Sequence, residues 1–192
     1  MIKQAIATLA LTLSLASSAV HAQESNCDGW MASDWEVAKQ FWEVATSETV
    51  ADCLKSGSSV NARDEDGKTP LHYAAWVNKS PEVLTLLLEA GADINARTTS
   101  GWSSLQMAAG WNENLKIITV LLDAGAGVNA RDEDGATPLN WASYNESLSA
   151  MEIIAMLLTA GADVNHTDEF IGTALHNAVY SKTQNTSINH FI

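Results

Sequence analysis

The chain has 192 residues, of which 10 are Lys or Arg and 23 are Asp or Glu, so its formal net charge is −13. Nucleic acids and anionic membranes are bound through basic surfaces, and the composition therefore argues against both kinds of partner. A basic protein partner is compatible with this charge, as is an acidic surface that only keeps the protein in solution.

Residues 1–22 have the pattern of a secretory signal peptide. Lys3 gives a positive start, a stretch rich in Leu and Ala follows, and Val20-His21-Ala22 is a small-residue cleavage signal. A membrane anchor is the alternative, but the stretch is shorter and more polar than the roughly 20 apolar residues that span a bilayer. We therefore expect a periplasmic or secreted protein that begins near Gln23 and, without Lys3, carries a net charge of −14.

An extension of residues 23–33 precedes the first expected helix pair. Ser33 and Glu36 have the spacing of a capping box, which predicts a helix start there. A second helix is expected to begin at Thr46 or Ser47. The extension and this helix pair would form the N-terminal end of the fold.

Both cysteines, Cys27 and Cys53, lie in this N-terminal segment. In an oxidising compartment such a pair more often forms a disulfide than stays free, and a bridge would attach the extension to the first helix pair. It would stabilise the fold by about 3 kcal/mol. Two free thiols are the alternative, while a zinc site is disfavoured because no second Cys or His lies at finger-like spacing.

Four copies of one pattern follow, and each begins at a glycine: Gly57, Gly91, Gly125 and Gly161. These glycines are 34, 34 and 36 residues apart. Self-similarity at such a period is typical of a solenoid, in which one supersecondary unit is repeated along the chain. We therefore expect one array and no linker between separate domains.

Each copy predicts the same three elements. An Asp-Gly or Ser-Gly dipeptide marks a tight turn at 66–67, 100–101 and 134–135, so the polar run around it should form a short hairpin. Thr69-Pro70 then favours the start of a first helix, because threonine caps helices well and proline is tolerated in the first turn. A second helix is predicted by apolar residues three and four positions apart, at Val83, Leu84, Leu87, Leu88, Ile117, Ile118, Leu121, Leu122, Ile153, Ile154, Leu157 and Leu158.

Thr-Pro-Leu-His at 69–72 and Gly-Ala-Asp-Ile-Asn at 91–95 resemble the ankyrin repeat. The resemblance covers residues 34–181 and implies an all-α solenoid of about four helix-turn-helix units joined by short β-hairpin loops. The intervals exceed the usual 33 residues, and we expect the extra residues to lengthen surface loops around 78–80 and 145–149. Residues 182–192 lack a Leu-Leu run, so the last repeat should be incomplete and the tail frayed. In that repeat Ile171 stands where the turn glycine is expected.

No catalytic, cofactor-binding or metal-ligating residue is predicted. His72 and His176 occupy equivalent positions, and the copies between them carry Gln106 and Asn140 there, so a hydrogen-bonding side chain suffices. The resemblance implies that this histidine ties neighbouring hairpins together. The Asp-Glu-Asp-Gly runs lack the ligand spacing of a calcium loop, and no paired acid and base is evident. An enzyme that uses the acidic face is the least favoured alternative.

The partner surface implied by the resemblance comprises the hairpin tips and the ends of the first helices. It contains Glu65, Asp66, Lys68, Trp76, Val77, Trp102, Trp111, Glu133, Asp134, Tyr144, Phe170 and Tyr180. Trp and Tyr often anchor interfaces, but Trp76, Trp111 and Tyr144 could instead cover the lengthened loops, and both interpretations stay open. We expect Trp102 to be the most exposed of these side chains and Trp141 to lie partly in the core.

The most favoured function is an exported ankyrin-repeat module for protein–protein interaction, monomeric and without cofactors. An inhibitor or immunity-type protein that blocks a secreted enzyme is the alternative. Because a fold does not by itself determine a function, the prediction rests on the surface that the fold displays.

Overall fold

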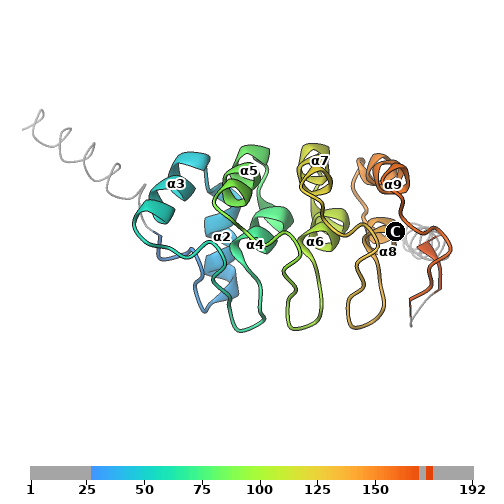
Figure 1. Ribbon diagram of the computed structural model, residues 1–192, viewed down its shortest axis with the longest axis horizontal. Helices are drawn as coiled ribbons and strands as arrows, with labels where there is room; N and C mark the ends of the chain where they lie inside the picture. The colour runs from blue at the N-terminus through green and yellow to red at the C-terminus, as the bar shows by residue number, and fades with distance from the viewer. Residues whose placement is uncertain (1–26, 169–171, 175–192) are drawn as a thin grey trace, which may run out of the picture.

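The computed structural model describes residues 27–168 and 172–174, and within them the chain forms eight helices in four pairs. The pairs are α2 (Trp35–Val44) with α3 (Ser47–Lys55), α4 (Pro70–Val77) with α5 (Pro81–Glu89), α6 (Ser104–Trp111) with α7 (Leu115–Asp123), and α8 (Pro138–Tyr144) with α9 (Ala150–Thr159). Figure 1 shows two parallel rows, with the inner helices α2, α4, α6 and α8 between the outer helices and the long loops. The predicted all-α array of paired helices is confirmed.

The inner helices α4, α6 and α8 begin with a reciprocal cap. The N–H of Thr69 donates to Nδ1 of His72 over 3.1 Å, and the equivalent residues Ser103 and Thr137 are capped in the same way by Gln106 and Asn140. The first helix starts one residue later than its sequence predicts, because Asp34, and not Ser33, is the N-cap: its carboxylate accepts the N–H of Glu36 over 2.9 Å. The predicted start of α3 after Thr46 is confirmed.

The outer helices supply most of the large aliphatic side chains of the core. Val83, Leu84 and Leu87 of α5 have no exposed surface, and neither do Ile117, Ile118 and Leu121 of α7. In α9 only Ile153 and Leu157 are fully buried, while Leu158 is 41% exposed. Of the four predicted apolar positions in each outer helix, three are fully buried in α5 and in α7, where Leu88 and Leu122 are partly exposed, and two are fully buried in α9.

The predicted hairpin loops are present as tight turns, each closed by a backbone hydrogen bond from the first residue of the turn to the last. The N–H of Asp64 donates to the carbonyl of Lys68 over 3.1 Å, and Thr98 to Trp102 repeats this bond over 3.0 Å. In the described part of the chain the only β pairing is an isolated bridge between Thr167 and Thr173. The fourth loop closes through Gly172, while Ile171 and residues 175–192, where the incomplete repeat and the tail were expected, lie outside the described residues.

The N-terminal end is held by a disulfide and by tryptophan packing. Cys27 and Cys53 are bridged, with their Cα atoms 5.6 Å apart, as their spacing and context predicted. Next to the bridge, the indole N–H of Trp42 donates to the carbonyl of Trp30 over 2.9 Å, and that of Trp30 donates to Ser59 over 3.1 Å. The extension is thus packed against α2 and the loop that follows α3.

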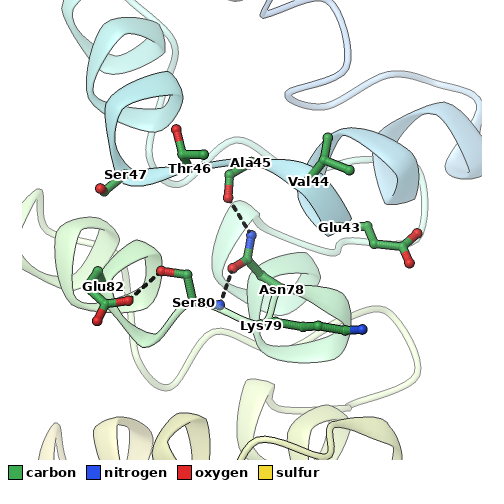
Figure 2. Close-up of a pocket in the computed structure, with 9 residues that line it drawn as sticks. All are labelled: Glu43, Val44, Ala45, Thr46, Ser47, Asn78, Lys79, Ser80 and Glu82. Carbon is green, nitrogen blue, oxygen red and sulfur yellow. Dashed lines mark hydrogen bonds between the residues drawn. The ribbon is translucent and has the colours of Figure 1, made fainter.

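The turn between paired helices is built around a buried asparagine. Asn78 is 1% exposed, and its amide donates to the carbonyls of Trp42 and Ala45 in the preceding unit over 2.6 and 2.9 Å. Its Oδ1 accepts the N–H of Ser80, whose hydroxyl donates to Glu82 (Figure 2). A hollow of about 520 Å³ lies here, but these polar groups bond to one another. The expectation of a lengthened surface loop is therefore wrong for Asn78, which joins two units.

Candidate protein-binding surface

Seven aromatic side chains form two clusters of ring contacts along the inner helices, one of Trp35, Tyr73 and Trp76 and one of Trp102, Trp111, Trp141 and Tyr144. We call this set the aromatic belt: Trp35, Tyr73, Trp76, Trp102, Trp111, Trp141 and Tyr144. The ring of Trp35 in α2 stacks on that of Trp76 in α4 at 6.4 Å between centroids, and Trp141 contacts Tyr144 in α8 at 6.0 Å. Because each inner helix contributes at least one ring, the belt runs along one side of the whole array.

The densest part of the belt is a triad of tryptophans from two units. Trp102 stacks on Trp111 with 5.3 Å between ring centroids, and Trp141 lies 4.9 Å from Trp102 and 5.1 Å from Trp111. The prediction that Trp102 is the most exposed ring is wrong, because its two neighbours cover it; Trp111 is 44% exposed instead. Trp141 is partly buried, as expected.

The ring contacts also bear on the two interpretations of the belt. Trp76, at the end of α4, contacts Trp35 and Tyr73, and Trp111, at the end of α6, contacts Trp102 and Trp141. These contacts are with other rings along the belt. They favour two packed clusters of rings, separated between Trp76 and Trp102, over isolated side chains that each cover a loop.

Two hollows adjoin the belt and share the walls Trp76 and Trp111. The smaller one, of about 210 Å³, we call the slot; it is lined by Lys68, Trp76, Trp102, Met107 and Trp111. The larger one, of about 580 Å³, is lined by Lys39, Glu43, Trp76, Val77, Lys79, Trp111, Asn112, Glu113 and Asn114. The slot has apolar walls, whereas the larger hollow is rimmed by charges of both signs.

Sequence reasoning missed Trp35 and Lys39. Trp35 is 52% exposed, and the ammonium of Lys39 lies 5.8 Å from the ring centroid of Trp35 and 5.6 Å from that of Trp76. A cation between two indoles in this arrangement gains a cation–π attraction. Both residues precede the first repeated copy, so self-comparison of the repeats could not point to them; their spacing of four on one helix face was the available signal.

The hairpin tips carry the exposed carboxylates of this side. Glu65, Asp66, Glu133 and Asp134 are all exposed, and the ammonium of Lys68 bonds to Asp66. Neighbouring loops are joined through their backbones, since the N–H of Thr99 donates to the carbonyl of Asp66 over 2.8 Å. The tips are therefore positioned by the array. Phe170 and Tyr180, also expected on this surface, lie outside the described residues.

His72 ties two loops together, as the resemblance implied. Its Nδ1 accepts the N–H of Thr69, so Nε2 carries the proton that is donated to the carbonyl of Trp102 over 3.1 Å. Burial lowers the pKa of His72 to about 4. Gln106 makes the same bond, to Ala136, over 2.7 Å. In both repeats this position carries an uncharged side chain that donates a hydrogen bond to the next loop, which supports a structural role for His72.

A second buried polar group positions the belt itself. The carboxylate of Asp132 accepts the indole N–H of Trp141 over 2.8 Å, and Asp64 accepts the hydroxyl of Tyr73 over 2.8 Å at the equivalent place. Burial raises the pKa of Asp132. These two carboxylates orient aromatic rings through hydrogen bonds. Neither forms an acid–base pair with the ring that it holds.

Within the described ranges 27–168 and 172–174, no three His, Cys, Asp or Glu side chains converge as metal ligands. The same ranges hold no helix with the length and apolarity needed to cross a bilayer. The surface built by the belt and the tips offers rings, an apolar slot and carboxylates, which suit it to binding.

The family model described as Ankyrin repeats (3 copies) matches residues 41–98, 77–168 and 105–189 of the chain. The chain belongs to the ankyrin repeat family. Ankyrin repeats are modules for protein–protein interaction and typically have no enzymatic activity. A comparison with the curated proteins finds no match to this chain.

Proposed function

We propose that this ankyrin-repeat protein is an exported, monomeric module that binds a protein partner through the aromatic belt and the hairpin tips. The proposed contact residues are Glu65, Asp66, Lys68, Trp76, Val77, Trp102, Trp111, Glu133, Asp134, Tyr144, Phe170 and Tyr180, together with Trp35. The observation that carries the proposal is the triad of Trp102, Trp111 and Trp141, which displays a ring that is 44% exposed beside an apolar slot.

Removal of water from such a surface, when a partner covers it, contributes favourably to the free energy of binding. Trp and Tyr bury a large area with few rotatable bonds. The residues that contribute most of the binding free energy at protein interfaces are often Trp or Tyr. The rings are already packed on one another and held by bonds such as that from Trp141 to Asp132, so binding would order few side chains. Rigid recognition with little backbone movement follows from this arrangement.

Charge should select the partner and speed its approach. Among the described residues, the ion pairs involve Asp52 and Asp66 as their only carboxylates, which leaves Glu65, Glu133 and Asp134 at the tips without a basic side chain within bonding distance. A basic partner would be attracted to these tips, and its association would weaken at high salt.

Export is supported by two features. Residues 1–22 have the composition of a signal peptide, and Cys27 forms a disulfide with Cys53, a bond that persists in oxidising compartments. We therefore place the partner in the periplasm or outside the cell. If that partner is a secreted hydrolase whose activity falls on binding, the module is an inhibitor or immunity-type protein.

The test is affinity capture from a periplasmic or secreted fraction, with the chain from Gln23 as bait, at low and high salt. Wild type should retain a defined protein at low salt, and Trp111→Ala should weaken its binding by at least about tenfold. Leu148→Ala is the control, because Leu148 is fully exposed on the loop before α9 and makes no ring contact with the belt. Equal capture by Trp111→Ala and wild type would contradict the proposed surface.

A further inference from the structure

The slot between α4 and α6 is shaped by side chains that leave an apolar space between them. Trp76 and Trp111 come from the ends of these helices, Trp102 from the loop before α6, and Met107 from the middle of α6, where it is 2% exposed. Lys68 completes the wall with its methylene groups, since its side chain is only 17% exposed and its ammonium bonds to Asp66. The charge of Lys68 is thus neutralised at the rim.

The size of the slot limits what it can hold. Sites for drug-sized ligands have volumes of about 300–1,000 Å³, whereas the slot has about 210 Å³. It has room for one side chain. A charged group would lose more free energy of hydration in this space than a cation–π contact with the indoles returns to a cation, so an aromatic or large aliphatic group fits best. An aromatic ring would also gain edge or stacking contacts with the tryptophans.

The surroundings of the slot select the chain that carries this side chain. The loops on either side of Trp102 bear the exposed carboxylates Glu65, Glu133 and Asp134, and the adjoining larger hollow is lined by Glu43 and Glu113. The basic groups of that hollow are Lys39, which lies against two indoles, and Lys79. Acidic groups therefore exceed free basic ones around the slot, and the whole chain has a net charge of −13.

We propose that the slot is the anchor site for one Phe, Leu or similarly large apolar side chain, carried on an extended basic segment of the partner protein. This inference rests on the proposed function and specifies the chemistry of the partner's contact. The anchor supplies desolvation inside the slot, and the flanking Lys or Arg residues face the carboxylates of the hairpin tips.

The test uses synthetic peptides and the chain from Gln23. Fluorescently labelled Gly-Lys-Lys-Phe-Lys-Lys-Gly should bind saturably, as measured by anisotropy, and replacing its Phe by Ala should weaken binding by at least about tenfold, because burial of one such side chain is lost. The peptide Gly-Glu-Glu-Phe-Glu-Glu-Gly should not bind. Equal binding of the Phe and Ala peptides would overturn the anchor, and equal binding of the acidic peptide would overturn the charge selection.

Two variants connect the peptide to the slot. Lys68→Phe should fill the slot and abolish the preference for Phe over Ala, while Lys116→Phe, the same change on the exposed face of α7, should preserve it. Trp111→Ala, which removes a wall, should also abolish the preference if Lys68→Phe proves unfolded by circular dichroism. An unchanged preference in either folded slot variant would overturn the proposal.

The two proposals fail in different ways. If Trp111→Ala loses a captured protein but no peptide shows a preference for Phe, the module binds proteins and the slot is not its anchor site. If the peptides show the preference but no protein is captured from the exported fraction, the slot binds as inferred and the proposed function is wrong.

Discussion

The two ends of the helix array differ in how far their apolar side chains are covered. At the N-terminal end, the Cys27–Cys53 disulfide and the buried Trp30 and Trp42 pack against the first helix pair. At the other end, α9 exposes Met151 by 70% and Leu158 by 41%. Since each unit of a solenoid buries its apolar faces only against its neighbours, an end needs a cap of its own, and at the N-terminal end the disulfide and the two tryptophans supply it.

One kind of tie between units stops short of the last loop, where a different tie, from Nε2 of His166 to the carbonyl of Gly135 over 2.7 Å, joins this loop to the one before it. His72 and Gln106 each reach the carbonyl of the next loop, at Trp102 and Ala136. Asn140 occupies the third such position, and its buried Nδ2 has no hydrogen-bond partner in the described structure. We therefore expect opening of the array to begin at the α8–α9 pair, and each prediction below tests this difference between the ends.

The largest difference is expected between two equivalent isoleucines. Ile118 of α7 is fully buried between two outer helices, whereas Ile154, at the same place in α9, is partly exposed. Ile118→Ala should lower the free energy of unfolding by about 2 to 5 kcal/mol, and Ile154→Ala by about 1 kcal/mol. Urea unfolding followed by circular dichroism measures both losses. Equal losses would show that α9 is packed as fully as α7.

Reduction of the disulfide should remove the covalent part of the N-terminal cap. Cys27 and Cys53 are 26 residues apart, and a bridge over such a loop contributes about 3 kcal/mol by restricting the unfolded chain. Unfolding with and without reductant measures the change. A variant with alanine at both positions is the control and should not respond to reductant; a wild type that is equally insensitive would contradict the role of the bridge.

His72 makes the first tie between loops sensitive to acid. Burial lowers its pKa from 6.5 to about 4, so the unfolded chain binds the proton first as pH falls. The contribution of His72 is therefore complete above about pH 6.5 and is lost towards pH 4, by about 3 kcal/mol in total.

The variant His72→Gln isolates this effect, because Gln106 already makes the equivalent bond. It should unfold like wild type at pH 7 and be more stable than wild type at about pH 4.5, since glutamine has no proton to gain. The difference in urea midpoint between the two proteins, measured against pH, tests this. A constant difference from pH 7 to about pH 4.5 would show that the pKa of His72 is the same in the folded and unfolded states.

How far the sequence alone could predict this molecule depends on whether a residue recurs. Caps such as Thr69 and core positions such as Leu87 appear in several copies, so comparing the copies with one another is enough to locate them. Trp35 occurs once and outside the copies, and its contact with Trp76 joins two units, so no periodicity reveals it.

The turn asparagines show how a small change in helix length hides a recurring residue. Asn145 donates to Ala109 as Asn112 donates to Ala75, and each bond joins neighbouring units. Asn145 nevertheless follows Asn112 by 33 positions, one fewer than the interval of 34 between Asn78 and Asn112, because α8 is one residue shorter than α6. A fixed period therefore misplaces the third asparagine by one residue.

The exposure of the belt tryptophans is also not predictable from the repeat pattern. The repeat pattern places Trp102 at a hairpin and Trp111 at a helix end, and this favours the hairpin residue as the exposed one. The structure reverses the order, because Trp111 and Trp141 both pack on Trp102. Which ring covers which depends on side-chain packing between units, and a one-dimensional pattern carries no information on it.

The smallest expected effect is a gain in stability at neutral pH, from a change at the C-terminal end of the array. The carbonyl of Ala136 accepts the N–H of Asp132 over 3.1 Å and the side chain of Gln106 over 2.7 Å. At the next loop the carbonyl of Gly172 accepts the N–H of Asp168 over 3.1 Å, and the shorter side chain of Asn140 leaves its Nδ2 unbonded.

By analogy with Gln106 and Ala136, we expect the added methylene of Asn140→Gln to bring this amide to the carbonyl of Gly172. Because a buried donor then gains its partner, the free energy of unfolding should rise by about 1 kcal/mol. The reverse change, Gln106→Asn, is the matched control and should lower it by about 1 to 3 kcal/mol. Urea midpoints of the two variants test the pair together. If Asn140→Gln destabilises while Gln106→Asn does as expected, the last loop does not follow the geometry of the loop before it, and the weakness of the C-terminal end has another origin.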